Sequence, residues 1–304
     1  MSGVSRVAKT VAIAGAAAFA YGALIEVRSF RVRRFCADIL PAGSEKLRIL
    51  HISDLHLMAR QRRKLDFVAA LSGLEPDLVV STGDNLAQPE ALEPLLTALG
   101  RLREVPGVFV FGSNDYVGPR LSNPLAYLAG DSGKHSAAAS TRPMPTQALR
   151  AAFESTGWHD VTGRREQLTL RGVTVEFRGT DDAHWERDDY SVVAGAPAEG
   201  TDVALGITHA PYQRVLDAMT DDGVDLILAG HTHGGQVCVP GWGALTTNCD
   251  LEPARAKGLS TQETAAGTSL VHVSAGLGTS PYAPYRFACP PEVTLLTLRP
   301  ASNG

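Results

Sequence analysis

The amino-acid sequence predicts an α/β fold, and two features indicate it. Between Leu47 and Phe111, three apolar runs of strand length alternate with helical stretches, and each run ends in polar residues. This alternation is typical of βαβ units that form a parallel sheet. Farther along, two strand-like runs flank Arg171-Gly172, which indicates a hairpin and a switch to antiparallel pairing. We therefore expect a domain with mixed sheets.

Length and composition narrow the class of protein. A chain of 304 residues is long enough for one large α/β domain or two small domains. A hydrophobic fraction of 44% indicates a globular protein, and a net charge of -4 argues against nucleic-acid binding, which usually shows a basic stripe. The four cysteines are far apart and form no C-x-x-C pair, so we expect free thiols and no cysteine metal site. The oligomeric state is left open.

The first segment, residues 1–28, differs in kind from the rest of the chain. Arg6 and Lys9 precede an uncharged, alanine-rich run over Thr10–Ile25. This run is shorter than a typical spanning helix of about 20 residues and longer than the apolar core of a signal peptide. We interpret it as an anchor at the cell membrane. The alternatives are an exported chain with a signal peptide cleaved near Ala18-Phe19-Ala20, and a helix docked on the domain.

Basic residues after this segment leave the side of the membrane open. Arginines at 28, 31, 33 and 34 favour a cytoplasmic domain by the positive-inside rule. However, Phe30, Val32 and Phe35 alternate with them, as in an edge strand with one solvated face. Residues 29–304 are predicted to form the globular domain.

The strands and helices of this domain follow from apolar periodicity, taken in chain order. In the first half we predict strands at Leu47–Ser53, Asp77–Ser81 and Val108–Phe111. Helices are predicted between them, at Arg62–Leu74 and Pro89–Arg103. Residues 119–147, rich in serine, alanine, proline and glycine, are interpreted as a flexible insertion near the site. In the second half we predict helices at Ala148–Ser155 and Tyr212–Met219. Strands are predicted at Leu168–Leu170, Val173–Phe177, Val203–Thr208 and Val224–Ala229. Three further strands are predicted to close a second sheet, at Gln236–Val239, Leu270–Ser274 and Val293–Leu298.

Side chains that bind metals follow the predicted strands. Asp54 and His56, spaced at i and i+2, can share one face, and His231 and His233 repeat this spacing in a glycine-rich loop. Taken singly, Asp54 is also consistent with a helix cap, and His56 or His209 with a satisfied polar residue. The complete set exceeds what one tetrahedral ion needs and suits two ions that share a carboxylate. Its members are Asp54, His56, Asp84, Asn114, His209, His231 and His233. A nearby segment, Gly179 to His184, is typical of a solvated turn, with a substrate-side role as the alternative.

In order and number, these motifs resemble the signature of the calcineurin-like metallophosphoesterases. The family's D-x-H, G-D, G-N-H, single H and G-H-x-H correspond to Asp54-Leu55-His56, Gly83-Asp84, Gly112-Ser113-Asn114-Asp115, His209 and Gly230-His231-Thr232-His233. The resemblance covers about Leu47 to Leu298, and the membrane-anchored or exported bacterial phosphodiesterase-like branch is most similar. It implies a four-layer α/β/β/α sandwich with two mixed sheets.

The resemblance also implies cofactors, roles and a reaction. Asp54, His56 and His233 would hold a first ion, Asp84 would bridge, and Asn114, His209 and His231 would hold a second. The two ions would be manganese, iron or zinc, divalent or of mixed valence. A hydroxide between them would attack phosphorus in line, so the implied substrate is a phosphate ester and the implied activity a phosphodiesterase.

One motif departs from the family pattern. Aligned without a gap, the ligand asparagine becomes Ser113 and the catalytic histidine becomes Asn114. Because serine is a poor ligand, we prefer a shift by one residue, which keeps Asn114 on the metal and puts Asp115 in the histidine's place. Either alignment lacks the histidine that acts on the leaving oxygen, and an aspartate replaces it only with a raised pKa. The predicted catalytic residues are Asn114 and Asp115, and the alternative function is a membrane-tethered, metal-containing binding protein with weak or lost catalysis.

Overall fold

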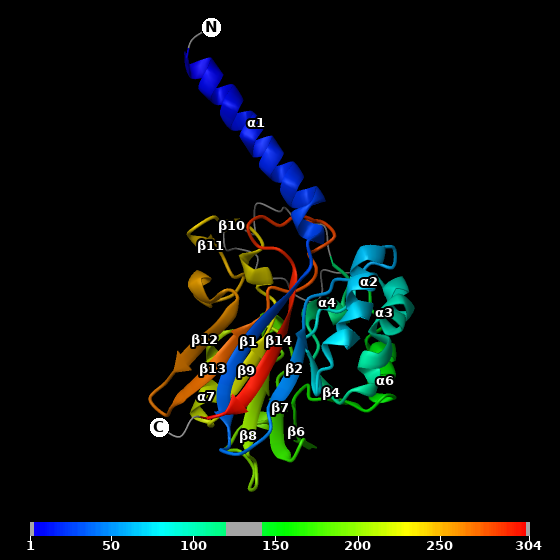
Figure 1. The fold of residues 1–304 in the computed structure, drawn as a ribbon, viewed down its shortest axis with the longest axis vertical. Coiled ribbons are helices and arrows are strands. Elements are labelled where there is room, and N and C mark those ends of the chain that lie inside the picture. The colour runs from blue at the N-terminus through cyan, green and yellow to red at the C-terminus, as the bar shows by residue number, and fades with distance from the viewer. Residues whose placement is uncertain (1–2, 120–141, 302–304) are drawn as a thin grey trace.

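Two six-stranded sheets pack face to face and form the centre of the molecule (Figure 1). The computed structural model describes residues 3–119 and 142–301, so most of the insertion predicted over 119–147 lies outside the described residues. The first sheet contains, in spatial order, β1 (Arg31–Leu40), β14 (Glu292–Pro300), β2 (Leu47–Ile52), β3 (Leu78–Ser81), β4 (Gly107–Phe109) and β5 (Trp158–Asp160). The second contains β12 (Gly258–Glu263), β13 (Thr268–Val273), β9 (Leu226–Ala229), β8 (Val203–Ile207), β7 (Val173–Gly179) and β6 (Arg164–Leu170).

Helices cover the outer face of each sheet and complete four layers. The helices on the first sheet are α2 (Arg62–Ala70), α3 (Leu92–Leu99) and α6 (Thr146–Glu154), and the second sheet is covered by α7 (Gln213–Asp221). Alternate residues of one strand point to opposite faces. In β2, Ile49 packs between the sheets while Leu50 packs under the helices, and both are buried. Both sheets combine parallel and antiparallel pairs, so the predicted α/β/β/α sandwich is confirmed.

The predicted elements are mostly present, with shifted ends. The run predicted as one helix over Pro89–Arg103 is instead divided into η3 (Pro89–Ala91), α3 and η4 (Gly100–Glu104). It changes direction at Gly100, whose φ of 43° lies in the left-handed region. The edge-strand interpretation near residues 30–35 is confirmed, since β1 is the first strand of its sheet.

The prediction that Val293–Leu298 closes the second sheet is wrong. These residues belong to β14, which lies in the first sheet between β1 and β2. β14 pairs parallel to β1 and antiparallel to β2. The predicted strand over Gln236–Val239 is also not in the second sheet, because β10 (Cys238–Val239) pairs only with β11 (Gly243–Ala244) in a separate ribbon. Apolar periodicity identifies a strand but carries no information on its neighbours.

The helix α1 (Gly3–Leu24) projects away from the sandwich, and its C-terminal end is fixed to the domain (Figure 1). Gly22 packs against the backbone of Arg286, where an added Cβ would lie 2.5 Å from the carbonyl oxygen. Just beyond, the buried carboxylate of Glu26 accepts hydrogen bonds from the amides of Ala288 (3.1 Å) and Cys289 (2.5 Å). By length and composition, the apolar segment Val7–Arg28 could span a membrane or act as a signal sequence, and only 11% of its apolar 18-residue window is buried.

Replacing Glu26 by alanine is expected to lower the free energy of unfolding by about 2 kcal/mol, because two amide donors lose their acceptor. Chemical denaturation monitored by circular dichroism measures this change. Glu93→Ala, an exposed glutamate in the first turn of α3, is the matched control and should change stability by less than about 0.5 kcal/mol. Equal stability of the two variants would show that the Glu26 contact does not fix the end of α1.

Candidate metal centre

The predicted ligands meet at one edge of the sandwich, beyond the carboxyl ends of parallel strands. Asp54 follows β2, Asp84 follows β3, His209 follows β8, and His231 and His233 follow β9. Parallel strands deliver their carboxyl ends to one edge, and the two packed sheets bring their edges together. The loops therefore gather side chains that are distant in sequence, such as His56 and His233, which lie 177 residues apart.

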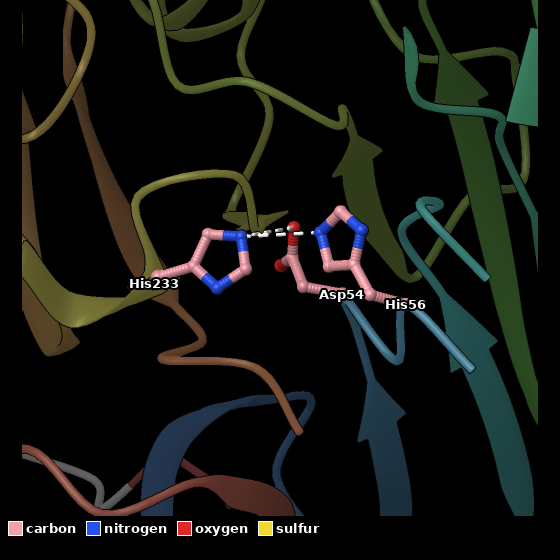
Figure 2. Close-up of side chains that lie close together, drawn as sticks. All are labelled: Asp54, His56 and His233. Atoms are coloured by element: carbon pink, nitrogen blue, oxygen red, sulfur yellow. Dashed lines mark hydrogen bonds and ion pairs between the residues drawn. The ribbon is translucent and has the colours of Figure 1, made fainter. Parts of the chain in front are cut away.

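Asp54, His56 and His233 form the first cluster of ligand atoms, which lie within 4.8 Å of one another (Figure 2). The Nε2 atoms of His56 and His233 are 3.2 Å apart, and Oδ1 of Asp54 lies 3.7 Å from Nε2 of His233. Burial lowers the pKa of His56 to about 4, so the imidazole is neutral near pH 7 and offers a lone pair. Two neutral rings and a carboxylate that converge in this way form a donor set suited to a divalent ion.

Asp84 connects this cluster to a second one. Its Oδ2 atom lies 3.4 Å from Nε2 of His56 and 3.5 Å from Nε2 of His209. Asp54, Asp84 and His209 also have ligand atoms within 4.8 Å of one another. One carboxylate oxygen thus lies between two imidazoles that the resemblance assigns to different ions.

His231 and Asn114 lie beside these clusters. The ring centroid of His231 is 5.2 Å from that of His209. The carboxamide of Asn114 donates from Nδ2 to Oδ2 of Asp84 at 2.7 Å, and its backbone amide donates to Oδ1 at 2.8 Å. Turning the carboxamide by half a rotation would present its oxygen, which is the ligand atom, in the same direction.

Backbone carbonyls orient two of the histidines by accepting from Nδ1, the ring nitrogen opposite the candidate ligand atom. Nδ1 of His209 lies 2.7 Å from the carbonyl of Thr82, and Nδ1 of His233 lies 3.1 Å from that of Gly278. A carbonyl can only accept, so in each ring Nδ1 carries a proton and Nε2 is the atom that can face an ion. Nε2 of His209 is buried and has no hydrogen-bond partner among the described residues, as expected of a ligand atom.

His231 is oriented the other way. Its Nε2 atom lies 3.2 Å from the carbonyl of Asn248, which leaves Nδ1 as the ring nitrogen that could bind an ion. Sequence patterns did not reveal the carbonyls of Thr82, Gly278 and Asn248, because a main-chain acceptor needs no particular side chain.

Five of the seven candidate ligands share an unusual backbone conformation. Their φ angles are positive, in the left-handed region that costs L-residues roughly 1 kcal/mol or more each. These angles are 49° for Asp54, 41° for His56, 54° for Asp84, 68° for His231 and 50° for His233. Neighbouring glycines allow the loops to approach closely. A Cβ on Gly230 would lie 1.9 Å from Oγ of Ser53, and one on Gly112 would lie 2.4 Å from Oδ1 of Asp84.

The site carries an excess of negative charge. Burial lowers the pKa of His209, but the carboxylates of Asp84, Asp54 and Asp182 outweigh it and raise this pKa to about 9. The pKa of Asp54 is itself raised, to about 6, chiefly by burial. Carboxylates that raise the pKa of a neighbouring imidazole stabilise positive charge between them, and a bound cation can supply that charge. The donor atoms, their orientation and the charge therefore fit divalent metal ions.

Asp115, predicted in the place of the catalytic histidine, lies beneath the Asp84 loop. Its buried carboxylate accepts from the amides of Asp84 (2.7 Å), Asn85 (2.8 Å) and Gly112 (3.1 Å). Burial and the Asp84 carboxylate raise the pKa of Asp115 to about 7, although the amide donors favour its ionised form. Its role at the leaving oxygen stays a prediction, and its contacts indicate that it positions Asp84.

His184 lies on the other side of His231, with its ring centroid 4.4 Å away. It belongs to the segment for which the sequence left a turn and a substrate-side role open. Asp182 caps this turn by accepting from the amide of His184 at 3.2 Å, and Nδ1 of His184 lies 3.0 Å from the hydroxyl of Tyr212. The segment is therefore a turn that also borders the candidate site.

Comparisons with known proteins agree with this site. The family model described as calcineurin-like phosphoesterase matches residues 47–235. The uncharacterised metallophosphoesterase YkuE of Bacillus subtilis is 24% identical over 271 residues, which cover 86% of this chain and 82% of YkuE. A bovine transmembrane protein with a metallophosphoesterase domain is 30% identical over 204 residues, which cover 65% of this chain and 43% of that protein.

Among solved structures, TT1561 of Thermus thermophilus has a TM-score of 0.43 and 14% identity, with 77% of this chain and 91% of that chain covered. The family model spans more than half of the chain and includes all seven proposed ligands, so the family assignment agrees with the candidate site. The chain belongs to the calcineurin-like phosphoesterase family and is a metal-dependent phosphoesterase hydrolase.

Proposed function

We propose that the protein is a binuclear metallophosphodiesterase. The observation that carries this proposal is the position of Oδ2 of Asp84, 3.4 Å from Nε2 of His56 and 3.5 Å from Nε2 of His209. A single oxygen between two sets of imidazoles suits a carboxylate that bridges two ions. In this proposal the first ion is held by Asp54, His56 and His233, and the second by Asn114, His209 and His231.

The ions, when bound, supply a water acidified toward hydroxide and neutralise charge on the phosphoryl oxygens. The chain's own residues hold the ligand atoms in place before substrate arrives. The hydroxyl of Ser53 donates to Oδ2 of Asp54 at 2.5 Å, and the amide of His231 donates to the same oxygen at 3.0 Å. Such preorganised contacts avoid reorganisation during the reaction, which is a large part of electrostatic catalysis.

The hydrogen bonding of the buried lysine and arginine near the site supports a diester over a monoester as the substrate. The buried cations nearest the ligands are committed to main-chain carbonyls: Nζ of Lys64 donates to Leu55 at 2.6 Å, and Arg286 donates to Ala275 and Gly278, each at 2.6 Å. A phosphodiester carries one negative charge at phosphorus and a monoester up to two, so a diester needs less compensation beyond the ions.

Metal removal and reloading test the proposal. The full chain, stripped with a chelator, should not hydrolyse bis(4-nitrophenyl) phosphate, and manganese, iron or zinc should restore turnover with about two ions per chain. In kcat/KM, the diester should be preferred over 4-nitrophenyl phosphate by about tenfold or more, which corresponds to a difference of about 1.4 kcal/mol in activation free energy. Metal content is measured on the same sample.

Three results would contradict this proposal. One bound ion at full activity would refute the binuclear site, and a preference for the monoester would refute the phosphodiesterase. Two bound ions with no turnover of either ester would favour the alternative function, a metal-containing binding protein that has lost catalysis.

A further inference from the structure

A cavity of about 600 Å³ lies between the end of α1 and the loops of the metal centre. Its apolar wall includes Val27 and Phe30 from the chain just after α1, and Leu277 and Pro281 from the loop before β14. Four arginines also line it. The cavity thus combines an apolar wall with guanidinium groups, a combination suited to an amphipathic anion.

Three of these arginines are available to a ligand. Arg60, Arg62 and Arg63 come from the turn after Met58 and the first turn of α2, and all are exposed. None of them forms an ion pair or side-chain hydrogen bond with another residue in the described part of the chain. The fourth, Arg28, is held at the end of α1 by a hydrogen bond of 2.6 Å to the carbonyl of Leu24. A surface with unpaired guanidinium groups this close together favours a phosphate-bearing ligand.

The cavity lies where α1 joins the domain, and this position indicates the source of such a ligand. The short turn Glu26–Arg28 connects α1 to β1, which runs parallel to β14, and β14 pairs antiparallel with β2. The start of β1 therefore lies at the edge of the sheet where β2 ends and Asp54 follows. The helix leaves the domain at the edge that carries the metal ligands, and it presents exposed Val11, Ile13 and Phe19 to its surroundings.

Some residues that line the cavity also belong to the loops of the candidate metal centre. Met58 is two residues beyond His56, and Gly278 supplies the carbonyl that lies 3.1 Å from Nδ1 of His233. A phosphate held in this cavity would therefore lie next to the loops that carry both histidines.

We propose that this cavity binds the anionic headgroup of a membrane phospholipid, with the phosphate on the arginines and the start of the acyl chains against the apolar wall. The proposal rests on the anchor interpretation of α1, which places the cavity at the lipid–water interface. It also narrows the substrate class of the proposed phosphodiesterase to phosphate esters of lipids.

Lipid retention on the full chain tests this binding without using catalysis. The protein is reconstituted in nanodiscs of equimolar phosphatidylglycerol and phosphatidylcholine, and the lipids that remain bound are identified by native mass spectrometry. We expect phosphatidylglycerol to be enriched about fivefold or more, as a charge-selective site requires. In Arg60→Gln/Arg63→Gln the enrichment should fall below about twofold.

A matched variant separates the cavity from general surface charge. Lys46→Gln/Arg101→Gln removes the same charge from two exposed residues that precede β2 and β4, at the opposite edge of the first sheet. It should retain the full enrichment of phosphatidylglycerol and the full hydrolysis of bis(4-nitrophenyl) phosphate.

Several outcomes would overturn the inference. These are equal retention of the two lipids by the unmodified protein, equal losses in the two double variants, and displacement of the lipid by millimolar inorganic phosphate, which would identify a site for free phosphate. Absence of diester hydrolysis with lipid enrichment intact would refute the proposed function and leave the lipid site standing, so the two failures can be told apart.

Discussion

Asp84→Asn is expected to lower kcat/KM for bis(4-nitrophenyl) phosphate on the order of 10³-fold. The substitution keeps the size of the side chain, and asparagine tolerates the φ of 54° at this position, so the loop should retain its shape. What is lost is the charge on the oxygen that lies between His56 and His209. Charge stabilisation by bound ions contributes several kcal/mol, and about 4 kcal/mol corresponds to 10³-fold in rate.

The same samples should be assayed for metal content, because the bridging role predicts that occupancy falls together with the rate. Asp225→Asn is the matched control. This exposed aspartate lies just before β9, at the end of the strand far from His231, and it accepts from the amide of Ala204 at 2.8 Å. Its rate should stay within about twofold of the unmodified protein. If Asp84→Asn behaved like this control, Asp84 would not be the bridging ligand.

Asp115→Ala is expected to lower the free energy of unfolding by about 4 kcal/mol, measured by urea denaturation with a chelator present. Three amides, those of Asp84, Asn85 and Gly112, would lose their buried acceptor. Because the Asp84 loop would lose its support, hydrolysis of esters with good and poor leaving groups should fall by the same factor. Asp66→Ala, an exposed position in α2, is the control and should leave stability within about 0.5 kcal/mol.

The conservative variant Asp115→Asn distinguishes the two roles considered for this residue. It retains one acceptor oxygen, so a positioning role predicts a loss of stability smaller than that of Asp115→Ala. A proton donor at the leaving oxygen predicts a different pattern. Turnover would fall selectively for esters with poor leaving groups. That pattern would contradict the positioning role and confirm Asp115 in the histidine's place.

The sequence predicted the parts of the site that depend on side chains at strand ends. Asp54, Asp84 and His209 each follow an apolar strand, and the parallel βαβ pattern was enough to place them at one edge. Strand order was less predictable. β14 lies between β1 and β2 because it pairs with both, and pairing partners are not encoded in the periodicity of a single strand.

Two other features were beyond sequence reasoning for a different reason. β5 has three residues, one of them the charged Asp160, and is too short for a periodic signal. The main-chain acceptors that orient His209, His231 and His233 depend on how distant loops pack, which no local pattern describes. The motif order identified the family, and the geometry added the orientation of the histidine rings.

The left-handed backbone of the ligand loops has a consequence for how this protein can change over evolutionary time. Aspartate, asparagine and histidine tolerate positive φ better than most residues, and β-branched residues tolerate it poorly. The loops with φ of 41° at His56 and 68° at His231 therefore accept few replacements at these positions, chiefly Asn, Asp and Gly, without changing shape. A descendant that lost metal binding through such replacements would keep the backbone conformation of these loops. The conformation of these loops can therefore persist after metal binding is lost, and relatives with the same loop conformation need not share an activity.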